Sequence, residues 1–365
     1  MRVIGQNELV RVTGSDGGMF WKDMDKSMIA NLLAQACPSI QYRIRRELLG
    51  EAPSTPEMIS LQTRIGEDVQ VREVLGWQQP DGWLGWNFHG FGGMEAGIRL
   101  LCEKGLSRNH PAFVRALESI DRFPDRLARG LGKVSRVFDE LGLGGPHFIL
   151  AALLAHAGAE NHPVVRDQLT VALNGMNALL AVKSREQWLE DYRGNLVLRS
   201  GMLWPGIYHL RLLAWTNGWR TAGTLEQVRA CVSRLVELSP MPAYHVRHKS
   251  QLIAPASFCM DDFNPDLNRM DSPGWMCWFH RMELLARMGV VSGIPALKQQ
   301  VAALAEILAG SGGRFTRRLT HPYFRQWGAY TGLMLEEDWK KPQRRENDLT
   351  FRSLIILHYS GLLKN

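Results

Sequence analysis

The densest group of residues able to do chemistry lies in one acidic loop. Residues 259–271 read Cys-Met-Asp-Asp-Phe-Asn-Pro-Asp-Leu-Asn-Arg-Met-Asp, which places carboxylates at Asp261, Asp262 and Asp266. Clustered carboxylates can keep one member protonated as an acid, because like charges resist ionising together. The same oxygens could instead bind Mg²⁺ or Ca²⁺ at Asp262 and Asp266. A third interpretation is structural, with Asp271 capping a helix that begins directly after it.

The metal-ligand patterns in the sequence are incomplete. Leu267 stands where a calcium loop of this kind needs glycine. Cys277 and His280 are three residues apart on a predicted helix and could supply two zinc ligands, but no third is evident. The sequence therefore predicts no cofactor, with magnesium or calcium at Asp262 and Asp266 as the alternative.

Histidine and aromatic residues gather in the long loops and near the starts of several predicted helices. Tyr244 and His245 precede the acidic loop and join Asp261 and Asp262 as candidates for catalysis by proton transfer. Aromatic faces can stabilise a cationic intermediate or stack against a sugar. The predicted substrate-binding residues are Trp83, Trp86, His89, His147, Trp204, Tyr208, His209, Trp275, Tyr323 and Trp327.

A repeated pair of helices is expected to position these residues. Gly93 opens an apolar segment that matches the segment opened by Gly145, 52 residues later, and both copies continue to an Asn-His-Pro triplet, at His110 and His162. Apolar residues spaced three and four apart predict one helix before each triplet and one after it. Self-similarity at a fixed period indicates helical pairs that bury one another's apolar faces.

Looser copies of this unit continue along the chain. Thr224 and Gln227 form a capping-box pattern at the start of one predicted helix. The further helical segments are expected at 26–36, 39–50, 56–77, 205–235, 272–308 and 349–359. Only residues 1–14 and 195–199 show a pattern that favours short strands. The long loops fall at 78–92, 184–203, 240–271 and 310–328, always between helical pairs.

These elements predict an all-α chain in which about six helix pairs close into an (α/α) toroid. In such a ring the long loops would meet at one mouth. We expect residues 1–25 to form an N-terminal arm and residues 26–365 to form a single toroid domain.

Composition excludes several classes of protein. The chain has 365 residues and a net charge of +7, but its basic residues are spread rather than gathered into a stripe, which argues against a nucleic-acid partner. No apolar run approaches the roughly 20 residues of a transmembrane helix. Five scattered cysteines and the lack of a secretory signal favour a reducing, cytoplasmic location.

One segment resembles a known superfamily. Residues 71–83 read Val-Arg-Glu-Val-Leu-Gly-Trp-Gln-Gln-Pro-Asp-Gly-Trp, with Gln78 ending a predicted helix and Trp83 following a glycine turn. This segment is similar to the glutamine–tryptophan repeat of terpenoid cyclases and protein prenyltransferases, whose fold is an α–α toroid. One clear copy is present, and Trp83 directly follows Gly82 instead of leaving one residue between them.

The resemblance also gives the acidic loop an expected role. Proton-initiated cyclases of that superfamily use a D-x-D-D acid, and here Cys259 stands in place of the first aspartate while Asp261 and Asp262 remain. Loss of that neighbour weakens the like-charge crowding that keeps a proton on the acid.

The resemblance favours binding or transformation of a small apolar, isoprenoid-type molecule in a central aromatic-lined cavity. Two alternatives stay open, because a fold does not fix an activity. One is a carbohydrate-active (α/α) barrel lyase or hydrolase, and the other is a non-catalytic binding or scaffold protein. The oligomeric state is not predicted.

Overall fold

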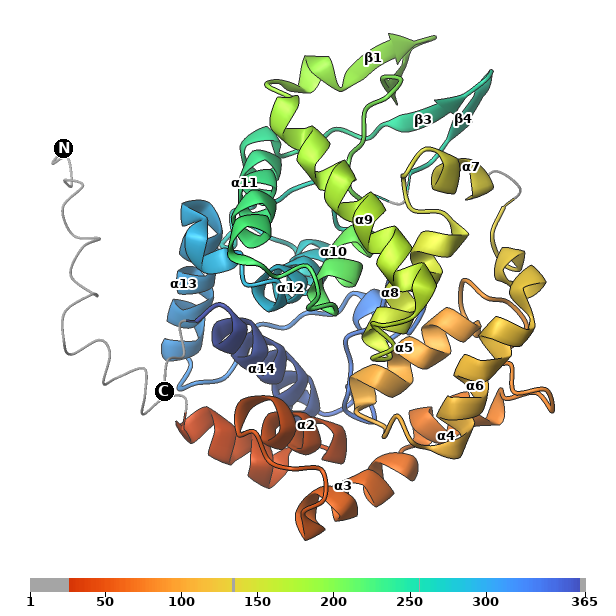
Figure 1. Ribbon diagram of the computed structural model, residues 1–365. Coiled ribbons are helices and arrows are strands. Elements are labelled where there is room, and N and C mark those ends of the chain that lie inside the picture. Colours follow the sequence, from red (N-terminus) through yellow and green to blue (C-terminus); the bar gives the residue numbers. More distant parts are fainter. Residues whose placement is uncertain (1–25, 133–134, 256, 362–365) are drawn as a thin grey trace, which may run out of the picture.

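The computed structural model describes residues 26–132, 135–255 and 257–361. The predicted arm at 1–25 and the strand pattern at 1–14 lie outside the described residues. The described chain is mostly helical, and its elements follow one another around the molecule from α2 to α14, which lies beside α2 (Figure 1). None of the described helices combines the length and the apolar character that a membrane crossing requires.

Six helices, which we call the core helices, pack against one another in chain order. Helix α2 contacts α5, α5 contacts α8, α8 contacts α10, α10 contacts α12, and α12 contacts α14. Two side-chain contacts link α14 to α2 and the turn that follows it. The Tyr359 hydroxyl donates to Glu47 at 3.2 Å, and the Arg43 guanidinium lies 4.9 Å from the centre of the Phe351 ring. The core helices are α2 (Pro38–Arg43), α5 (Met94–Lys104), α8 (Pro146–His156), α10 (Ile207–Ala214), α12 (Ser272–Arg287) and α14 (Pro342–Tyr359).

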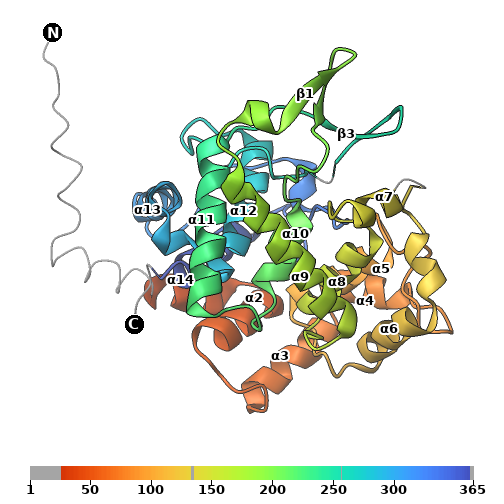
Figure 2. The ribbon, with the colours of Figure 1, turned by 45° about the horizontal axis from the view of Figure 1, so that its top comes forward.

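The remaining helices cover the core helices. Helix α3 packs on α2, α4 on α5, α9 on α8 and α13 on α14, while α9 and α11 lie side by side (Figure 2). Their bounds are α3 (Pro56–Gly66), α4 (Val69–Gly76), α6 (Pro111–Arg122), α7 (Ser135–Glu140), α9 (Pro163–Ala178), α11 (Ala222–Leu238) and α13 (Pro295–Ala309). A helix over 26–35 precedes α2, and the short helical turns are Ile44–Leu48, Pro124–Ala128, Leu179–Ala181, Arg185–Gln187, Val291–Gly293 and Pro322–Phe324.

Both helical pairs predicted from the 52-residue repeat are present. Helices α5 and α8 begin directly after Gly93 and Gly145, and α6 and α9 begin after His110 and His162. At each of the two histidines, Nδ1 accepts the backbone N–H two residues further on, at 3.3 Å. The proline that follows each histidine needs no hydrogen-bond acceptor at the first helical position. The repeated triplet is therefore a helix start.

Several predicted helix boundaries are wrong. Residues 56–77 form two helices rather than one, because the Asp68 side chain caps α4 by accepting the N–H groups of Gln70 and Val71. Helix α11 begins before Thr224, whose N–H donates to the capping hydroxyl of Thr221. Helix α14 begins at Pro342, about two turns before the apolar segment 349–359 that predicted it.

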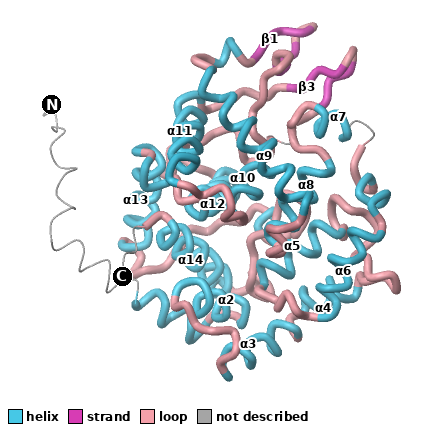
Figure 3. Tube along the Cα trace, viewed as in Figure 1, coloured by secondary structure: helices cyan, strands magenta, loops and turns pink. Residues whose placement is uncertain are grey.

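A small four-stranded sheet lies within two of the long loops (Figure 3). Strands β1 (Leu189–Tyr192) and β2 (Asn195–Leu198) form an antiparallel hairpin, as do β3 (His245–His248) and β4 (Gln251–Ile253). The hairpins join through parallel pairing of β2 with β3. The strand predicted at 195–199 is confirmed, whereas the other three strands were not predicted. The described chain is therefore mostly helical with a small sheet, and not all-α as predicted.

Candidate functional site

Charged side chains fill the space between the core helices. Arg43, Glu95, Arg99, Arg211 and Arg352 are all buried, together with Glu283 and Arg287. Moving an ionised group out of water is costly unless partners surround it. Buried charge also tends to gather at functional sites. The buried charges form two groups, each with its own partners.

The first group is a network of three arginines and three glutamates. Glu47 and Glu103 each pair with two guanidinium groups and Glu283 pairs with three, so the network ties α5, α12 and α14 to α2 and its following turn. Its ion pairs are Arg352 with Glu103 (2.8 Å) and Glu283 (2.9 Å), Arg43 with Glu47 (2.6 Å), Glu103 (2.8 Å) and Glu283 (3.5 Å), and Arg287 with Glu47 (2.7 Å) and Glu283 (3.1 Å).

The carboxylates of this network are held in the ionised form. Burial alone would raise the pKa of Glu47, but Arg287 and Arg43 more than offset that effect and lower it to about 2. Burial likewise opposes ionisation of Glu103, yet Arg352 and Arg43 bring its pKa well below the usual range. Groups that stay ionised across the neutral range hold the helices together and are poor proton donors.

A second group surrounds Glu95 on α5. Glu95 Oε2 lies 2.7 Å from His89 Nδ1, and Glu95 Oε1 accepts the Tyr208 hydroxyl at 2.9 Å. Arg211 is also near, 3.5 Å from Oε1. Burial and the Glu95 carboxylate raise the pKa of Tyr208 well above its usual range. The structure thus brings together two predicted binding residues, His89 and Tyr208, through a glutamate that the sequence did not single out.

A row of aromatic rings leads outward from this group. The Tyr330 ring lies 5.4 Å from His89 and 5.8 Å from Tyr208, measured between ring centres. Phe258 follows at 5.6 Å from Tyr330, and Tyr323 at 6.4 Å from Phe258. Tyr208 is buried and Tyr323 is exposed. At the inner end of the row, Glu95 and Tyr208 are almost completely buried and border a cavity of about 10 Å³.

Charged and polar side chains line a pocket of about 480 Å³, which we call the arginine pocket. All six core helices reach it with their last residue or the residues just after it. Its lining residues are Tyr42, Arg43, Arg46, Glu47, Pro53, Cys102, Gly105, Leu106, Ser107, Arg108, Asn109, His156, Trp215, Arg287 and Tyr359.

The arginine pocket carries an excess of positive charge. Four arginines line it against a single carboxylate, Glu47, which Arg43 and Arg287 already share. Arg46 and Arg108 are exposed and form no ion pair with any described residue. Two guanidinium groups therefore remain available to a ligand.

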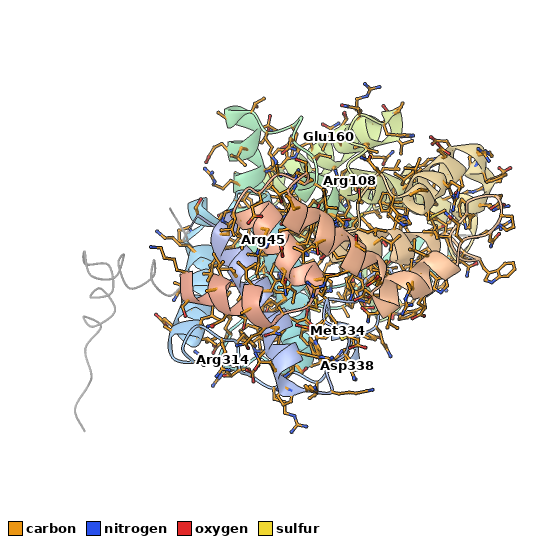
Figure 4. The ribbon with its side chains drawn as sticks, turned by 90° about the horizontal axis from the view of Figure 1, so that it is seen from below. Arg45, Arg108, Glu160, Arg314, Met334 and Asp338 are labelled. Carbon is orange, nitrogen blue, oxygen red and sulfur yellow. The ribbon has the colours of Figure 1, made fainter. Side chains whose placement is uncertain are left out.

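Arg108 is held at the edge of this pocket. Its Nη2 donates to the His156 carbonyl at 3.2 Å, and its guanidinium lies against Gly158, where a β-carbon would collide with it. Gly158 has a φ of +84°, a conformation that glycine adopts without strain. Figure 4 shows Arg108 near Glu160 on the face seen from below.

A stack of flat side chains lines the same pocket. The His156 and Trp215 rings are 4.2 Å apart and nearly parallel. The Arg287 guanidinium lies 4.4 Å from the centre of the Trp215 ring and 4.5 Å from that of Tyr359. Burial lowers the pKa of His156 to about 3, against the pull of Glu103, so the imidazole is neutral. The pocket thus has aromatic side chains beside its guanidinium groups.

The predicted catalytic residues are not gathered into one site. Asp261 is exposed, and Asp262 accepts the N–H of Asn264 at 2.9 Å within its own turn. Tyr244 is buried, which raises the pKa of its hydroxyl, and His245 lies in β3. Among the described residues, no hydrogen bond or ion pair joins these two to either aspartate.

The acidic loop has a visible structural role. Asp271 caps α12 by accepting the Gly274 N–H at 2.8 Å, as the structural interpretation predicts. Asp266 accepts the Asn268 N–H at 3.0 Å. Within the described ranges, no three His, Cys, Asp or Glu side chains are close enough to hold a metal ion. Magnesium or calcium binding at Asp262 and Asp266 stays a prediction.

The other predicted binding residues are scattered. Among the histidines, His147 pairs with Asp139 at 2.9 Å on the surface, and His209 is buried against Phe148. Trp86 lies in a loop, and its side chain is 79% exposed. The buried tryptophans are Trp83, beneath Arg126; Trp204, which donates to the Met260 carbonyl; Trp275, among Trp278, Phe279 and Phe315; and Trp327, beneath Arg99.

The resemblance segment forms the turn that its pattern predicts. Gln78 Nε2 donates to the carbonyls of Gly82 at 3.0 Å and Ala112 at 2.7 Å, so it satisfies backbone groups of the turn and of α6. The Gln79 side chain donates to the Gly85 carbonyl at 2.6 Å. These contacts are structural and carry no chemistry.

The sequence analysis did not identify the charged residues of the core, although a signal exists for two of them. Arg99 and Arg211 each interrupt an apolar run within a core helix, as in Ile98-Arg99-Leu100-Leu101. A lone arginine in such a run must find buried partners or a ligand. The glutamates give no comparable signal, because Glu47 and Glu103 resemble surface positions of amphipathic helices.

Comparisons of the chain with protein-family models, with curated proteins and with solved structures found no match. We therefore infer a function from the geometry of the described residues.

Proposed function

We propose that this protein is an (α/α) toroid that binds a small anionic molecule in the arginine pocket. One observation carries the proposal: a pocket of about 480 Å³ is lined by four arginines and one glutamate where six helices end. Ligand sites of small molecules commonly have volumes of roughly 300–1,000 Å³. Guanidinium groups bind carboxylates and phosphates through paired, charge-assisted hydrogen bonds.

The toroid part of the proposal is supported by the order of helix contacts. Each core helix packs on the next one along the chain, and Tyr359 with Glu47 links the last to the first. One or two covering helices separate each core helix from the next along the sequence. A ring of this kind explains why the ends of all six core helices meet around one pocket.

An isoprenoid ligand remains the second candidate, and the residues that line the pocket indicate how it would bind. Trp215, Tyr42 and Tyr359 place aromatic surface beside the arginines. The diphosphate group of a prenyl diphosphate would bind Arg46 and Arg108, and its hydrocarbon chain would pack against those rings. The charge of the pocket favours the anionic group as the main source of affinity.

A thermal-shift series separates these ligands. The melting temperature is measured with inorganic pyrophosphate, with geranyl diphosphate and with geraniol, at constant ionic strength. A ligand that binds only the folded state stabilises it by about 2.7 kcal/mol at 100 times its Kd. We expect pyrophosphate and geranyl diphosphate to raise the melting temperature and geraniol to leave it unchanged. A rise with geraniol alone would contradict the anionic assignment and favour an apolar ligand.

A further inference from the structure

A second cavity, of about 40 Å³, lies between the core helices near the centre of the molecule. It is separate from the arginine pocket, although His156 and Trp215 border both. Its lining residues are Arg99, Glu103, His156, Arg211, Trp215, His280, Glu283, Leu284, Gly332, Leu333 and Arg352.

The positive charges at this cavity are not all matched. Arg352 pairs with both carboxylates of the lining, Glu103 and Glu283. Arg99 forms no ion pair with any described residue. Its guanidinium donates instead to two backbone carbonyls, those of Ala329, at 2.9 Å, and Thr331.

Arg211 has only a long contact with a carboxylate, that of Glu95. It lies 3.5 Å from Glu95, which already accepts the Tyr208 hydroxyl and contacts His89. Its shorter hydrogen bond goes to the Ala329 carbonyl, at 2.7 Å. Burial and the neighbouring Arg211 lower the pKa of Arg99 to about 9, which leaves it charged at neutral pH.

A ring nitrogen without a partner borders the same cavity. His280 Nε2 is completely buried and has no hydrogen-bond partner among the described residues. Burial lowers the pKa of His280 well below its usual range, so the imidazole is neutral and carries one N–H. A buried polar atom without a hydrogen-bond partner destabilises the folded state.

We propose that this central cavity binds one small monovalent anion, with chloride as the probe, next to Arg99, Arg211 and His280. An anion would neutralise the unmatched guanidinium charge and could accept a hydrogen bond from the His280 ring. Water could satisfy the donors but would leave the charge in place. A cavity of about 40 Å³ is too small for a diphosphate, so this site differs from the arginine pocket in its ligand.

The test is a chloride titration at constant ionic strength, with sodium gluconate replaced stepwise by sodium chloride. Gluconate is too bulky for the cavity, so it does not compete with chloride there. We expect a saturable rise of about 2–4 °C in the wild-type protein. His280→Leu should raise the chloride concentration at half-saturation about tenfold, since a hydrogen bond to a charged group is worth about 1.5–3 kcal/mol. Arg99→Gln should abolish the response.

Two further measurements make the outcome decisive. The double variant Arg46→Ala/Arg108→Ala changes only the arginine pocket, so its chloride response should equal that of the wild type. Crystals of the wild-type protein grown in sodium bromide should show an anomalous peak in the central cavity, whatever the stability of the variants. Water alone in the cavity, or a chloride response lost only in the Arg46→Ala/Arg108→Ala variant, would overturn the proposal.

Discussion

Glu95 is the residue on which several buried groups depend. It is the carboxylate partner of His89, Tyr208 and Arg211, and it is almost completely buried. Removing one partner of a buried charge leaves the other uncompensated, which costs about 3–5 kcal/mol. We predict that Glu95→Gln lowers the free energy of urea unfolding by about 3 kcal/mol.

The matched control for this variant is Glu306→Gln. Glu306 is exposed on α13 and forms no ion pair with any described residue. Its loss should change the free energy of unfolding by less than about 0.5 kcal/mol. Equal stabilities of the two variants would contradict the role assigned to Glu95.

His209 gives a pH-dependent prediction. It is fully buried, and burial lowers its pKa to about 4, so in the unfolded chain its pKa is higher, near 6.5. Between these values the unfolded state binds a proton that the folded state excludes, so stability falls as the pH falls. We predict that His209→Gln reduces the loss of unfolding free energy between pH 7 and pH 4.5 by about 2 kcal/mol.

Glutamine is chosen because its side-chain oxygen can still accept the Gly206 N–H that His209 Nδ1 accepts at 3.1 Å. Urea unfolding at both pH values measures the effect, and His156 contributes equally to both proteins. An unchanged pH dependence in the variant would show that His209 does not titrate over this range.

At the scale of elements, Asp271 shows what the acidic loop does. Its side chain caps α12, and loss of such a cap typically costs about 1 kcal/mol. We predict that Asp271→Ala lowers the free energy of unfolding by about that amount, while Asp266→Ala, in the exposed part of the loop, changes it by less than about 0.5 kcal/mol. Urea unfolding with and without calcium measures both. A calcium-dependent stabilisation that Asp266→Ala abolishes would contradict the structural role.

The helix starts could be predicted from the sequence where a side chain or proline marks them. The Asn-His-Pro triplets predict α6 and α9, because the histidine ring accepts a backbone N–H and proline fits the first turn. The break at Asp68 was missed because apolar spacing continues across it. Strands β1, β3 and β4 were missed because three or four residues are too few for a clear periodic pattern.

At the scale of the whole molecule, the space between the core helices is lined differently from the prediction. The sequence analysis expects a central cavity lined by aromatic residues. The predicted aromatic residues mostly pack against helices or lie in loops, while arginines and glutamates occupy the space between the core helices. Periodicity can show that a helix is buried, but it does not show which helices face each other. The pairing of Glu47 with Arg287, 240 residues apart, depends on that missing information.

The most direct test of anion binding in the arginine pocket is isothermal titration calorimetry with inorganic pyrophosphate. Three proteins are compared: the wild type, the pocket variant Arg46→Ala/Arg108→Ala, and the control Arg72→Ala/Arg122→Ala, which removes two exposed arginines elsewhere. We predict one binding site in the wild type and the control, and an affinity at least tenfold lower in the pocket variant. Equal affinity in all three proteins, or no binding to the wild type, would contradict it.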